Sequence, residues 1–228
     1  MKKAFPFILV LIIIFGAAGY YLYSKSQKEE SSEQTEESSD EVESEEDQIV
    51  DPGETPVISK KSNNVLLVIA PSKYHDNEFS QTKNAIEGAG YETTVASKGV
   101  TTASGMLGGS VSVDLDLSQV DGNDYRALVF IGGTGNNIYF DDDNALELAR
   151  EFHAEEKVVA AICSAPAILA YAGILEGKKG TCDAGYKDYL TSKGATYTAE
   201  PVTVDGLIIT GKGPSAAEEF GEKIVQRL

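Results

Sequence analysis

Apolar runs alternate with amphipathic stretches from about residue 63 to the end of the chain. Strands are predicted over residues 64–71 (NVLLVIAP), 91–97, 126–135, 157–163 (KVVAAIC) and 178–182. Continuous apolar runs such as the first of these are typical of strands that are covered on both faces. Helical spacing and stop signals predict helices over residues 77–90, 141–156, 164–173, 185–194 and 215–228.

The order of these elements predicts an α/β fold. Strands that alternate with helices form a mostly parallel sheet between two layers of helices. Residues 200–210 add a small antiparallel hairpin around Asp205 and Gly206. Residues 111–120 alternate in polarity and are predicted to form a hairpin or a connection.

The amino end has the pattern of a membrane anchor. Lys2 and Lys3 precede a run of about 20 apolar residues, which is the length that spans a bilayer. The basic flank predicts that the amino terminus stays in the cytoplasm and that the rest of the chain lies outside it. We therefore predict a single-pass cell-membrane protein with an uncleaved anchor over residues 1–23. A cleavable signal peptide, which would give a secreted protein, is the alternative because small residues occupy positions 16–18.

Composition separates the anchor from the folded part. Residues 28–54 contain thirteen of the 36 acidic residues and one lysine, although the whole chain has a formal charge of −17. Such a segment cannot bury enough apolar surface to offset the entropy of ordering. We predict a disordered acidic linker over residues 24–61 and one folded domain over residues 62–228. The acidic balance also argues against nucleic acid as a partner.

Three segments that carry candidate functional residues follow predicted strands. They are the loop APSKYHDNE after residue 69, the turn GGTG at 132–135, and the corner ICSAP around Cys163. Ligands of an open parallel sheet bind beyond the carboxyl ends of its strands, so these segments are expected to meet at one edge. None of them is specific alone: the glycine turn lacks both the dinucleotide fingerprint and the lysine of a phosphate loop.

Several of these segments resemble one family. ALVFIGGTG, AAICSAPAILAYAGILEGKKGTC and VTVDGLIITGKGP, in this order, are similar to the DJ-one/PfpI (ThiJ/PfpI) superfamily, related to class I glutamine amidotransferases. The resemblance covers residues 63–228 and implies a flavodoxin-like three-layer sandwich. It also implies a homodimer or a larger assembly.

The resemblance implies roles for matched residues. Cys163 matches the reactive cysteine at the strand-to-helix elbow, and Glu78 matches the acid that hydrogen-bonds it. The backbone N–H groups of Gly133 and Ser164 would hold a developing oxyanion. A cysteine at a helix amino terminus is also expected to be more acidic than a free thiol.

The chain departs from the family where many members carry histidine. Ser164 and Asp183 occupy those positions, and His75, in the loop before Glu78, is an auxiliary candidate or a solvated loop residue. Cys–His proteolysis is therefore doubtful, and a metal site built from histidines is not expected. Cys182 is interpreted as a thiol that resolves oxidised Cys163, as a buried apolar residue, or, last, as half of a disulfide.

Two functions follow from these residues. The first is a membrane-tethered hydrolase or lyase of the glyoxalase/deglycase type, which acts on small reactive carbonyls through Cys163 and Glu78 without a cofactor. The second is a non-enzymatic redox sensor or chaperone-like stress-response module in which Cys163 is oxidised. An amidase or cysteine peptidase is a third reading that rests on fold analogy alone.

Overall fold

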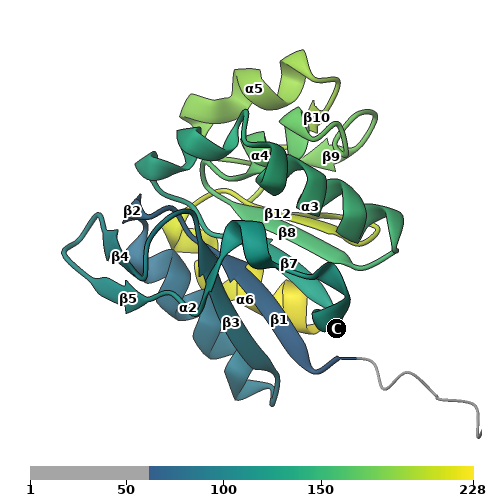
Figure 1. Cartoon of the computed structure of the whole chain (residues 1–228). Helices are drawn as coiled ribbons and strands as arrows, with labels where there is room; N and C mark the ends of the chain where they lie inside the picture. The colour runs from purple at the N-terminus through teal and green to yellow at the C-terminus, as the bar shows by residue number, and fades with distance from the viewer. Residues whose placement is uncertain (1–61) are drawn as a thin grey trace, which may run out of the picture. The chain divides into compact units, whose positions relative to one another are not determined.

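The computed structural model describes residues 62–228, so the predicted anchor and linker lie outside the described residues. Seven strands form the main sheet in the order β11-β12-β8-β7-β1-β3-β6 (Figure 1). Their bounds are β1 Asn64–Val68, β3 Glu92–Ser97, β6 Leu115–Asp116, β7 Ala127–Phe130, β8 Val158–Ile162, β11 Val202–Asp205 and β12 Ile208–Gly211. All neighbours are parallel except β11 and β12, which form the predicted hairpin.

Helices cover both faces of this sheet. Alternate residues of β1 point to opposite sides: Leu66 packs in one hydrophobic cluster and Leu67 in the other. The first cluster includes residues of α3 (Asp143–Ala154) and α4 (Pro166–Tyr171), and the second includes residues of α2 (Asp76–Gly88) and α6 (Ala217–Val225). Each fully buried leucine or phenylalanine contributes roughly 1.5–3 kcal/mol of burial energy. The predicted three-layer α/β sandwich is confirmed.

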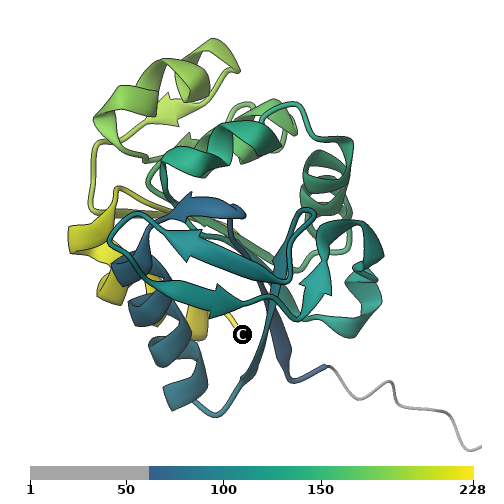
Figure 2. The ribbon, with the colours of Figure 1, turned by 60° about the vertical axis from the view of Figure 1, so that its left-hand side comes forward.

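Smaller elements surround the carboxyl edge of the sheet. The strands β2 (Ser72–Tyr74), β4 (Thr102–Gly105) and β5 (Ser110–Ser112) form a separate sheet, whose β4–β5 hairpin lies at the front of Figure 2. The predicted strand at 178–182 is shorter, β9 Lys179–Gly180, and pairs with β10 (Thr196–Tyr197) outside the main sheet. The helix α5 (Lys187–Ser192) lies between β9 and β10 in the chain.

Between residues 62 and 228, no helix combines the length and the apolar character that crossing a bilayer requires. The predicted anchor lies in the undescribed part of the chain, so it stays a prediction.

Candidate functional site

Cys163 occupies a strained corner between β8 and α4. Its φ is +65°, a left-handed conformation that costs a non-glycine residue on the order of 1–3 kcal/mol. The backbone N–H of Cys163 donates to the carbonyl of Gly211 over 2.9 Å, and its carbonyl accepts from the N–H of Asp183, also over 2.9 Å. Because neighbouring segments satisfy both backbone groups, the corner is held in this conformation.

A cavity of about 200 Å³ opens at this corner. Segments from five parts of the chain line it, and they meet at the carboxyl edge of the sheet as the strand order predicts. The lining residues are His75, Met106, Gly133, Thr134, Cys163, Ser164, Asp183 and Tyr186. The structure therefore brings together every predicted site residue except Glu78 and Cys182 in the wall of one cavity.

Glu78 lies directly behind the cysteine, against Gly132. A Cβ atom added to Gly132 would lie 2.1 Å from Oε2 of Glu78 and 2.5 Å from Cβ of Cys163. Real Cβ atoms do not approach other atoms this closely, so only glycine leaves room for both side chains. Gly132 is thus the point of contact between the first turn of α2 and the elbow.

Burial governs the charge of Glu78. Its side chain is inaccessible to solvent, and neither carboxyl oxygen has a hydrogen-bond partner of standard geometry among the described residues. Burial raises the pKa of Glu78 to about 7, although the nearby Cys163 thiol and the N–H of Gly132 act in the opposite direction. Glu78 therefore changes its protonation state near neutral pH.

The Cys163 thiol is not made acidic by its position. Burial is the largest cause that raises the pKa of Cys163, and the neighbouring charge of Glu78 raises it further. The N–H of Ser164 lowers it. The expectation of a more acidic thiol is therefore wrong while Glu78 is ionised, because burial and like charge exceed the effect of the short helix α4. The two groups titrate as a pair, which holds one proton between them above pH 7.

Replacement of Glu78 with glutamine is expected to change how stability depends on pH. The folded pKa of about 7 lies above the ordinary value of 4.5, so the folded state binds the extra proton. The contribution of Glu78 to stability is then fully present below pH 4.5, and roughly 3 kcal/mol of it is lost as pH rises through 7. Urea unfolding from pH 4 to 8 should show this slope in the native protein and lose it in Glu78→Gln. The surface variant Glu219→Gln should keep it, and an equal slope in all three proteins would contradict the assignment.

Ser164 acts as a connection between the elbow and the glycine turn. It is buried, and its Oγ donates to the carbonyl of Gly133 over 2.8 Å and accepts from the N–H of Gly133 over 3.2 Å. Asn136 donates a further hydrogen bond to this Oγ over 3.0 Å. The Gly133 N–H that was predicted to hold an oxyanion thus has a partner inside the protein, which a substrate oxygen would have to replace.

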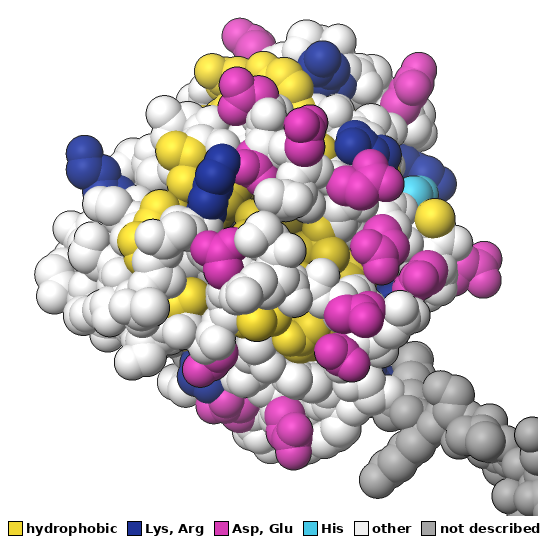
Figure 3. All heavy atoms as spheres, in the orientation of Figure 1, with side chains coloured by type: hydrophobic (Ala, Val, Ile, Leu, Met, Phe, Trp, Pro, Cys, Tyr) yellow, Lys and Arg dark blue, Asp and Glu magenta, His cyan; other side chains and the backbone are white. Residues whose placement is uncertain are grey.

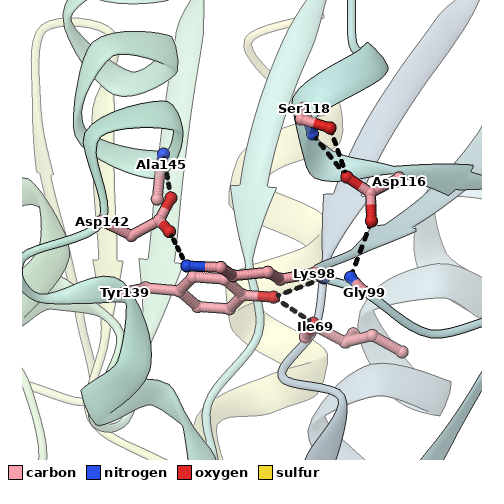
Figure 4. Close-up of polar contacts among 8 residues, drawn as sticks. All are labelled: Ile69, Lys98, Gly99, Asp116, Ser118, Tyr139, Asp142 and Ala145. Atoms are coloured by element: carbon pink, nitrogen blue, oxygen red, sulfur yellow. Dashed lines mark hydrogen bonds and ion pairs between the residues drawn. The ribbon is translucent and has the colours of Figure 1, made fainter.

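The 3-10 segment that follows this turn, Thr134–Tyr139, is fixed at its far end (Figure 4). The Tyr139 hydroxyl donates to the carbonyl of Ile69 over 2.8 Å and accepts from the N–H of Lys98 over 3.3 Å. Lys98 pairs with Asp142, which caps α3. Burial raises the pKa of Tyr139 to about 12, so this hydroxyl keeps its proton throughout the physiological range. These contacts tie the end of the segment to the residues that follow β1 and β3 and to the start of α3.

His75 lines the cavity, and Asp76 follows it as the first residue of α2. The N–H of His75 donates to the carbonyl of Gly132 over 2.8 Å, and its buried Nδ1 has no partner among the described residues. Asp76 accepts from the N–H groups of Leu107 and Gly109, over 2.8 and 2.7 Å. The carboxylate thereby holds the β4–β5 hairpin, which brings Met106 to the cavity. Sequence reasoning missed Met106, because a polar loop gives no periodic signal.

Cys182 and Asp183 diverge at the end of β9. Cys182 is fully buried in the hydrophobic cluster that contains α3 and α4, whereas Cys163 packs against the other cluster. Both thiols are free, and burial, with the charge of Asp183, raises the pKa of Cys182 to about 12. This placement favours the buried apolar reading of Cys182 over a resolving thiol. Among residues 62–228, no cluster of three His, Cys, Asp or Glu side chains could hold a metal ion.

Comparison with known proteins gives consistent similarities. The model of the DJ-1/PfpI family matches residues 63–227. A deglycase named PfpI from Pyrococcus furiosus is 34% identical over 165 residues, which cover 72% of this chain and 98% of the relative. A Bacillus subtilis protein, named only as a candidate cysteine protease, is 31% identical over 167 residues, or 72% of this chain and 97% of the relative.

Solved structures give the same result. The crystal structure of a ThiJ/PfpI domain protein from Brachyspira murdochii superposes with a TM-score of 0.71 and 37% sequence identity. The match covers 73% of this chain and 96% of that one. The relatives named here thus share the domain that begins near residue 63, and they are matched over nearly their whole length.

Proposed function

Because the chain belongs to the DJ-1/PfpI family, we propose that it converts small reactive carbonyl compounds through Cys163, with Glu78 as the proton carrier. The observation that carries this proposal is the packing of both side chains on Gly132 beside an open cavity. Chemistry of the deglycase or glyoxalase type needs one nucleophile and one proton shuttle, which this pair supplies. The name of the Pyrococcus relative supports the same class of reaction.

The proposed first step forms a hemithioacetal. Glu78 takes the thiol proton as the sulfur attacks the carbonyl carbon, and the proton then passes to the carbonyl oxygen. With methylglyoxal, Glu78 next moves a proton from C1 to C2 through an enediol, which leaves a thioester. Water hydrolyses the thioester to lactate and restores the thiol. The sum is methylglyoxal plus water to lactate, so no oxidant and no cofactor enters.

Replacement of Glu78 with glutamine tests the proton carrier. Loss of a general acid/base typically costs 10²–10⁴-fold in rate. We expect kcat for methylglyoxal to fall about 100-fold or more in Glu78→Gln, while Cys163 can still be alkylated. In the native protein, kcat/KM should rise as pH passes through 7, because the base form of Glu78 is the ionised one. This rise should vanish in the variant; a variant with native rates would exclude Glu78 as the carrier.

A redox-sensing role is the second candidate, and one observation favours it. Cys163 lines an open cavity beside Glu78, and the protonated form of Glu78 can donate a hydrogen bond to an oxidised sulfur. If the full-length protein turns over no carbonyl compound while mild peroxide modifies Cys163 stoichiometrically, this reading replaces the enzyme.

We also propose that the domain is tethered to the cell membrane by residues 1–23 through the acidic linker. This proposal rests on the apolar run and its basic flank in the sequence alone. Its extracytoplasmic placement and the dimer implied by the family resemblance likewise stay predictions.

A further inference from the structure

Asp183 places a carboxylate at the mouth of the nucleophile's cavity. It is solvent-exposed and lines the cavity, and its backbone N–H donates to the carbonyl of Cys163 over 2.9 Å. Its Oδ1 accepts from the N–H of Gly185 over 2.9 Å, which fixes the side chain in a local turn. The position of this charge relative to the thiol is therefore set by the backbone.

No protein cation neutralises this charge among the described residues. The cavity lining contains no lysine or arginine, and within residues 62–228 no basic group lies within 4 Å of the Asp183 carboxylate. The charge nevertheless acts on the site, since it contributes to the raised pKa of both Cys163 and Glu78. Asp183 therefore has an electrostatic effect on the nucleophile and no counter-ion of its own.

Tyr186 adds an aromatic ring to the same wall. Its ring centroid lies 5.8 Å from that of Tyr189 and 6.2 Å from that of Phe140, in a cluster that reaches the surface at Tyr171 and Tyr189. Hydrophobic side chains form a patch in the region of α5 at the top of Figure 3, with acidic side chains beside it and others mainly on the right-hand side of this face. A carboxylate beside an aromatic ring is the combination that recognises guanidinium and ammonium groups.

We propose that Asp183 and Tyr186 form a subsite for a positively charged group of the substrate, so that Cys163 reacts with cationic compounds in preference to anionic ones. The proposed carbonyl function supplies only the nature of the reacting group. The preference for charge is a property of the cavity, and it can be measured without turnover.

Methanethiosulfonates that carry either a trimethylammonium or a sulfonate group test this preference. Each reagent forms a mixed disulfide with Cys163 and releases methanesulfinate, and the rate is read at the Cys163 peptide by mass spectrometry of the full-length protein. A unit charge a few ångströms away changes the rates with the two reagents in opposite directions. We expect the ratio of the cationic to the anionic rate to be on the order of tenfold higher for Cys163 in the native protein than for a free thiol, and to fall clearly in Asp183→Asn, where only the charge of Glu78 remains.

The ratio of the two rates isolates the charge from other effects. A change in the pKa of Cys163 alters both rates equally and cancels. Asp188→Asn, which removes an exposed acid of α5 that does not line the cavity, is the matched control and should keep the native ratio. An unchanged ratio in Asp183→Asn, or an equal loss in Asp188→Asn, would overturn the subsite. Tyr186→Leu should reduce the preference for the ammonium reagent without affecting the sulfonate.

The proposed function and the subsite fail separately. If the native protein turns over no carbonyl compound but shows the charge ratio, the subsite stands and the reaction must be sought among other cationic electrophiles. If turnover is observed and the ratio is absent, the carbonyl chemistry stands without this subsite.

Discussion

Replacement of Cys163 with alanine is expected to remove carbonyl turnover, with kcat/KM reduced by 10³-fold or more. Without the sulfur no hemithioacetal forms, and Glu78 has no group to deprotonate. The full-length native protein and full-length Cys163→Ala should both be assayed by the loss of methylglyoxal and the appearance of lactate. Their urea unfolding curves should be compared to confirm that the fold is unchanged. Cys163→Ser should be nearly as inactive, because an alcohol beside a carboxyl of pKa about 7 is hardly ionised.

Cys182→Ala is the matched control for this experiment. Cys182 is buried in the cluster on the other side of the sheet, so its removal should leave the rate within about twofold while stability falls slightly. If Cys163→Ala consumes methylglyoxal at the native rate, the nucleophile assignment is wrong. If Cys182→Ala is the inactive variant, the two thiols have been assigned in reverse.

Replacement of Gly132 with alanine is expected to damage stability and chemistry together. The new methyl group would lie 2.1 Å from Glu78 and 2.5 Å from Cys163, and 2.9 Å from the carbonyl of Ile162. Over-packing of a rigid interior costs about 1–3 kcal/mol and displaces the side chains involved. We expect a lower free energy of unfolding in urea. We also expect at least a 100-fold loss of turnover, because the added methyl group pushes the nucleophile and its proton carrier apart.

Gly88→Ala provides the comparison at a glycine without neighbours. An added Cβ at Gly88, near the end of α2, meets no atom within 4 Å. Alanine should be neutral there or should stabilise the protein by up to about 1 kcal/mol, because it reduces the freedom of the unfolded chain. A Gly132→Ala protein with native stability and native turnover would mean that the elbow and α2 can move apart freely, contrary to the packing described.

Much of the fold was predictable because the strands carry strong local signals. The runs at β1, β7 and β8 are apolar on both sides, so their burial between two helical layers follows from the sequence. The site was predictable from the parallel direction of these strands, because the residues that follow parallel strands must meet at one edge of the sheet. Cys163, Gly133 and His75 were all placed in this way.

The remainder depends on contacts that no local pattern contains. The strands β2 and β4 are short and polar, and the turn after β4 is held by hydrogen bonds from Leu107 and Gly109 to Asp76, about 30 positions earlier in the chain. The raised pKa of Cys163 could not be predicted from its helix either, since it arises from burial and from Glu78, 85 positions earlier in the chain. Partners so distant in sequence are revealed only by the fold.

The left-handed backbone at Cys163 sets two selective pressures against each other at one position. Glycine would adopt a φ of +65° without strain, so folding alone favours glycine at this corner, whereas the chemistry proposed here needs sulfur. A descendant chain released from the demand for reactivity could gain stability by a single substitution. Retention of cysteine at the corresponding corner of a relative would then itself be a sign that the thiol is in use.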